Sequence, residues 1–64
     1  MNDIAILMSD LKELFPEEEF DMHDLINMIW NTDMYELMSM STDYTDFLHL
    51  VIERVIRFRG DENE

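Results

Sequence analysis

One glycine, one proline and no cysteine occur in the 64 residues, so few backbone positions are suited to tight or left-handed turns. Pro16 and Gly60 stand far apart, and no glycine-rich loop lies between them. Disulfide scaffolds, P-loops and dinucleotide-binding loops are therefore excluded, because each depends on cysteines or on clustered glycines.

Apolar residues recur at spacings of three and four along most of the chain, which is the pattern of amphipathic helices. These stripes predict helices over about residues 3–15, 22–31, 34–40 and 44–59. Asp21 is a good N-cap for the second helix, which is expected to begin there or as far back as Pro16. Asp33 and Glu36 have the spacing of a capping box for the third, and Gly60 stands where a left-handed helix terminus favours glycine. Because β-branched residues are scarce outside the last helix, the predicted fold class is all-α, a small bundle of three to four short helices.

The length fits a single helical domain, predicted over residues 1–60 and followed by a polar tail at 61–64. A chain this short buries only about 60% of the surface that its unfolded form exposes, so we expect marginal stability. The apolar side chains of the last predicted helix cover an arc of roughly 180°, which is wider than a surface helix needs. That helix is expected at the centre of the bundle. We also expect a homodimer, formed through the apolar faces of the second and last helices.

The charge is strongly one-sided, with 16 Asp and Glu against 4 Lys and Arg and a formal net charge of −12 at pH 7. Direct binding to nucleic-acid phosphates needs clustered basic residues, so that function class is excluded. An apolar fraction of 47% is nevertheless that of a globular protein. Neither a signal peptide nor a membrane span is expected, and the predicted location is the cytoplasm.

Residues suited to catalysis are few, since His23 and His49 are the only histidines and there is no cysteine nucleophile. A helix would place His49 on one face with Asp46 and Glu53. Such pairs are common on solvated helix faces, and we favour that interpretation over a metal or acid–base site. The acidic neighbours of His23 point at least about 100° away from it on a helix, so they do not converge. We therefore predict no enzyme activity, no cofactor and no metal.

Seven carboxylates form the predicted functional surface, and five of them fall within eight residues that contain no Lys or Arg. If that segment is helical, its negative charges repeat roughly every 2 Å along the axis, close to the ~1.7 Å spacing in duplex DNA. The alternative, that such charge only favours solubility and helix starts, stays open. The predicted residues are Asp10, Glu13, Glu17, Glu18, Glu19, Asp21 and Asp24.

Trp30 and Tyr35 are predicted to add apolar contact area to this surface, because Trp and Tyr are common interface anchors. Core filling is the more common role of a single Trp in so small a domain. The leading hypothesis is a non-enzymatic inhibitor that mimics nucleic acid and blocks the basic surface of a nucleic-acid-binding protein. Proteins of this kind are typical of phages and mobile elements. The alternative is a small regulatory or structural subunit that acts through apolar homodimerisation or docking.

Overall fold

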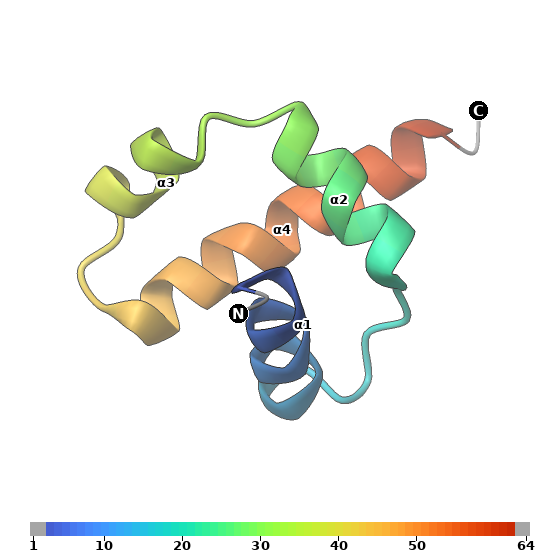
Figure 1. Ribbon diagram of the computed structural model, residues 1–64, viewed down its shortest axis with the longest axis horizontal. Coiled ribbons are helices and arrows are strands. Elements are labelled where there is room, and N and C mark those ends of the chain that lie inside the picture. The colour runs from blue at the N-terminus through green and yellow to red at the C-terminus, as the bar shows by residue number, and fades with distance from the viewer. Residues whose placement is uncertain (1–2, 63–64) are drawn as a thin grey trace.

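Four helices and their connections make up the part of the chain that the structure describes (Figure 1). This computed structural model describes the backbone of residues 3–62 and the side chains of residues 3–60. In chain order the helices are α1 (Asp3–Leu14), α2 (Met22–Trp30), α3 (Met34–Met40) and α4 (Tyr44–Glu62). The described residues contain no strand, so the predicted all-α bundle is confirmed.

The longest helix, α4, lies at the centre of the bundle as predicted, and α1, α2 and α3 each pack against it (Figure 1). α1 also contacts α2. Removal of apolar side chains from water is the main force that holds such a bundle together. The buried core consists of Leu11, Phe20, Leu25, Met28, Leu37, Leu48, Val51, Ile52 and Val55.

The broad apolar arc of α4 is largely covered within a single chain. Val51 and Val55 are fully buried, and α2 supplies Leu25 and Met28, which are fully buried as well. The three shorter helices therefore cover most of this arc, since α2 lies against α4 along its apolar face. A homodimer through the apolar faces of α2 and α4 is not needed to bury them, and it stays a prediction.

The starts of α2 and α3 follow the local signals of the sequence. The N-cap of α2 is Asp21, as predicted, and the helix does not reach back to Pro16. Asp33 caps α3, because its carboxylate accepts hydrogen bonds from the backbone N–H groups of Tyr35 at 3.1 Å and Glu36 at 3.3 Å. Glu36 returns no side-chain hydrogen bond, so only half of the predicted capping box is present.

The predicted end of the last helix is wrong. α4 continues through Gly60 to Glu62, and no described residue has a positive φ. Gly60 therefore takes a helical conformation and not the left-handed one, since glycine permits φ > 0 without requiring it. The predicted polar tail begins inside this helix, and its residues 63–64 lie outside the described residues.

Candidate interaction surface

The acidic run at residues 17–19 lies in the connection between α1 and α2, where no residue is helical. A turn follows Phe15, closed by a hydrogen bond of 3.1 Å from the N–H of Glu18 to the Phe15 carbonyl. The helical charge array that would match the phosphate spacing of DNA is therefore absent, and that prediction is wrong. The three glutamates also precede the first turn of α2, outside the range in which a helix dipole favours acidic side chains.

Lys12 and Phe20 fix the two ends of this connection to one another. The Lys12 ammonium donates a hydrogen bond of 2.5 Å to the Phe20 carbonyl and lies 4.0 Å from the centroid of the Phe20 ring. Phe20 is itself a buried member of the core. Lys12 thus points toward the connection and holds it against the bundle.

Two of the predicted surface residues have a structural role at the start of α2. The Asp21 carboxylate accepts a hydrogen bond of 3.0 Å from the Asp24 N–H, and the Asp24 carboxylate accepts one of 3.0 Å from the Asp21 N–H. This reciprocal pair is a capping box. The hydrogen bond from the Asp24 backbone lowers the pKa of Asp21 below its ordinary value of 3.8. Both carboxylates are therefore used in folding, which the sequence indicated for Asp21 only.

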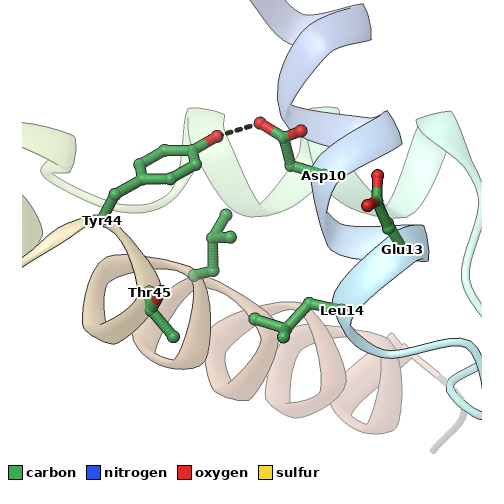
Figure 2. A pocket seen from close by; sticks show the side chains of 6 residues that line it. Asp10, Glu13, Leu14, Tyr44 and Thr45 are labelled. Atoms are coloured by element: carbon green, nitrogen blue, oxygen red, sulfur yellow. Dashed lines mark hydrogen bonds between the residues drawn. The ribbon is translucent and has the colours of Figure 1, made fainter.

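Two surface hollows meet at Leu14, which is 41% exposed. The first, of about 300 Å³, lies between α1 and the start of α4, and Figure 2 shows the side chains around it. The second, of about 260 Å³, lies along the end of α1 and the turn that follows. We call them together the Leu14 hollows. Their lining residues are Asp10, Glu13, Leu14, Tyr44, Thr45 and Leu48 in the first and Leu14, Phe15, Pro16, Glu17 and Glu18 in the second.

A hydrogen bond from the Tyr44 hydroxyl to the Asp10 carboxylate closes one side of the first hollow (Figure 2). Because the carboxylate accepts the phenolic proton, this bond raises the pKa of Tyr44 to about 12. The two residues lie 34 positions apart in the chain, and the bond joins α1 to the beginning of α4. Tyr44 is 52% exposed, so the bond forms in contact with water.

Four of the seven predicted carboxylates are gathered around the Leu14 hollows, which join acidic oxygens to an apolar floor. Asp10 and Glu13 line the first hollow, and Glu17 and Glu18 line the second. Glu19 is exposed but lines neither. Sequence reasoning missed the remaining lining residues, which include Leu14 and Tyr44. Leu14 lies at the edge of the apolar stripe of α1 and remains exposed, and no local signal places Tyr44 beside α1.

Trp30 and Tyr35 lie on the surface and not in the core. Each side chain is 84% exposed, so the core-filling interpretation is wrong for Trp30. They flank the connection between α2 and α3, on different elements from those that form the Leu14 hollows. The structure therefore divides the predicted partner-binding residues between two places on the surface.

The carboxylates of the described side chains form no salt bridge with a Lys, Arg or His side chain. The aspartates are engaged in part by helix caps and by Tyr44. The glutamates differ, because within residues 3–60 none of their side chains has a hydrogen bond or an ion pair. These six residues are Glu13, Glu17, Glu18, Glu19, Glu36 and Glu53.

The histidine cluster suggested by helical spacing is not a metal site in the described residues, which contain no group of three or more metal-ligating side chains. The His49 ring instead packs edge-on against Phe15, with ring centroids 5.1 Å apart and planes at 78°. No described helix is long and apolar enough to cross a membrane. Comparison of the chain with protein-family models, curated proteins and solved structures finds no match.

Proposed function

We propose that this protein is a non-enzymatic interaction module that occupies the basic, nucleic-acid-binding surface of another protein. One observation carries the proposal: the side chains of six glutamates have no partner within residues 3–60, and three of these glutamates are consecutive. Unpaired like charges repel each other and destabilise the compact state, so they are not explained by folding. A partner rich in Lys and Arg relieves that repulsion when it binds.

The Leu14 hollows suit the shape of basic side chains. Lys and Arg carry a long apolar stem that packs on apolar surface and a charged head that stays at a polar edge. Leu14 offers such a surface, with Glu13 on one side and Glu17 and Glu18 on the other. Because the acidic run is not helical, the proposed mimicry rests on the summed field of these carboxylates and not on a regular phosphate-like spacing.

The experiment begins with capture of basic nucleic-acid-binding proteins from cell extract at low and at physiological salt, with duplex DNA as competitor. A captured protein is then purified, and its affinity is measured for the natural chain and for a variant with Glu17→Gln, Glu18→Gln and Glu19→Gln. Gln keeps the size of the side chain while removing its charge. We expect weaker binding, a smaller dependence on salt, and loss of binding when DNA is added.

A double variant, Asp3→Asn and Glu53→Gln, is the control. It removes two charges from exposed residues that no described side-chain hydrogen bond engages and that line neither hollow, and its effect is compared per charge removed. Equal weakening per charge in both variants would mean that binding follows net charge alone. Unchanged affinity in the first variant would remove the acidic connection from the recognition surface.

The second candidate function is a small regulatory or structural subunit that docks through apolar contacts or forms a homodimer. The exposure of Trp30 and Tyr35, together with that of Met38 and Met40, favours it. Sedimentation at micromolar concentration distinguishes the homodimer, which should have twice the 7.8 kDa mass of one chain. Docking without charge recognition would survive the triple variant and fail on Trp30→Ala.

A further inference from the structure

The two most exposed large apolar side chains stand on either side of one short connection. Trp30 is the last residue of α2, Tyr35 is the second residue of α3, and each is 84% exposed. Five residue steps separate them, so their Cα atoms lie no more than about 18 Å apart. A single interface of ordinary size, about 800 Å² on each partner, is wide enough to include both.

The contact area that Trp30 and Tyr35 offer to a partner is large for so small a protein. A buried Trp or Tyr contributes about 150–250 Å² of contact surface, so the pair offers roughly 300–500 Å². That is about half of the area that one partner buries in an ordinary interface. This equals the area of the largest apolar patch on a typical monomer, and such patches are often functional. We call Trp30 and Tyr35 together the aromatic pair.

The negative charge around the aromatic pair restricts which kind of partner can bind over it. Residues 13–53 contain eleven Asp and Glu and no Lys or Arg. Asp33 lies between the two aromatic residues in the chain, and Glu36 follows Tyr35 directly. Both acidic residues are exposed. A second copy of this chain would bring the same negative charges face to face, which opposes association, whereas a basic segment has complementary charge.

We propose that the aromatic pair receives arginine side chains of a basic partner, with their guanidinium groups stacked on the rings. The inference rests on the proposed function and names the chemistry that one part of its surface recognises. A cation over the face of Trp or Tyr is attracted by the ring, and Trp is the best of the aromatic residues for this contact. Arginine fits better than lysine, because its guanidinium is planar, stacks on rings and is more weakly hydrated than an ammonium.

Trp30 is the only tryptophan in the chain, so its fluorescence reports directly on what covers the pair. The full chain is titrated with octa-arginine and, separately, with octa-lysine at the same low salt. Protection of Trp30 from quenching by acrylamide is measured alongside calorimetric affinity. We expect octa-arginine to protect Trp30 and to bind about twofold to fivefold more tightly than octa-lysine.

The variant Tyr35→Ala keeps the Trp30 reporter and should lower the affinity for octa-arginine about twofold to fivefold. Tyr35→Phe keeps the ring and should bind as the natural chain does. Because Tyr35 is almost fully exposed, neither substitution disturbs the core.

Four results would overturn the inference. Equal affinity for the two peptides, or calorimetric binding without protection of Trp30, would show that charge alone binds the peptide elsewhere, and the proposed function would stand. Protection of Trp30 that grows with protein concentration before any peptide is added would identify a second copy as the occupant. Absence of binding by either peptide would count against the proposed function as well.

Discussion

Replacement of Lys12 by Met tests how the acidic connection between α1 and α2 is held in place. Met keeps most of the length of the apolar stem and removes the ammonium group. The substitution therefore removes the hydrogen bond to the Phe20 carbonyl and the contact with the Phe20 ring. The substitution should not weaken α1 itself, because Lys and Met have similar helix propensity.

The expected loss follows from the two contacts. A hydrogen bond to a charged group contributes about 1.5–3 kcal/mol when it is shielded, and roughly half of that for a partly exposed group such as Lys12. The cation–π contact adds about 0.5–1 kcal/mol at an exposed site. A total loss of about 1.3–2.5 kcal/mol is a large share of the roughly 3–10 kcal/mol expected for 64 residues. The corresponding fall in Tm is about 5–20 °C.

Thermal melts followed by circular dichroism measure this effect, and Arg57→Met is the matched control. Arg57 is exposed, has no hydrogen bond or ion pair among the described residues, and carries the same charge as Lys12. Any change caused by the more negative net charge alone appears equally in both variants. If Lys12→Met melts within a degree or two of Arg57→Met, the contacts to Phe20 do not hold the connection, and the reasoning fails.

Three further predictions concern stability. Melting temperature should rise between low and physiological salt, because screening over a Debye length of about 8 Å weakens repulsion among the unpaired carboxylates, and a fall would contradict this. Leu25→Ala should cost about 2–5 kcal/mol and leave much of the chain unfolded by circular dichroism, whereas Ile6→Ala at an exposed position should stay within about 0.5 kcal/mol. Tyr44→Phe should cost less than about 1 kcal/mol, because Tyr44 is half exposed. Since the folded pKa of Tyr44 is raised to about 12, its contribution is complete below pH 10 and is lost as the pH rises toward 12. Denaturant titrations of the natural chain and of Tyr44→Phe should therefore show a difference in free energy of unfolding that shrinks across that pH range.

The fold was predictable because its main signals are local. Apolar spacing marks each helix, and short acidic side chains such as Asp21 and Asp33 mark where helices start. The burial of Phe20 could not be predicted from local sequence signals. Phe20 is a single apolar residue between acidic neighbours and has no periodic signal, yet it is buried and draws the acidic connection onto the bundle. Of the two helix starts left open by the sequence, the one at Pro16 is wrong, and the one at Asp21 is confirmed.

The candidate surface was only partly predictable. Residues on one helix could be grouped from the sequence, but contacts between residues far apart in the chain could not. Asp10 and Glu13 were placed on one face of a helix, and they do line one hollow. Tyr44 completes that hollow from 34 residues away, a contact that depends on how α1 crosses α4. The exposure of Trp30 depends on how α2 packs, because its neighbour Ile29 is the residue that packs against the core.

The aspartates and the glutamates differ in how far the folded structure uses their charge. Aspartate carboxylates cap α2, α3 and α4 and hold Tyr44, and these roles depend on a short side chain that reaches a nearby backbone N–H. The described glutamates, in contrast, have no intramolecular partner, and residues 17–19 stand outside any helix. Solubility alone requires a smaller net charge, roughly 2–8 in magnitude for a small domain. Folding and solubility therefore leave the unpaired Glu17 and Glu18 beside the exposed Leu14 unexplained, and this is why we propose recognition of a basic surface for them.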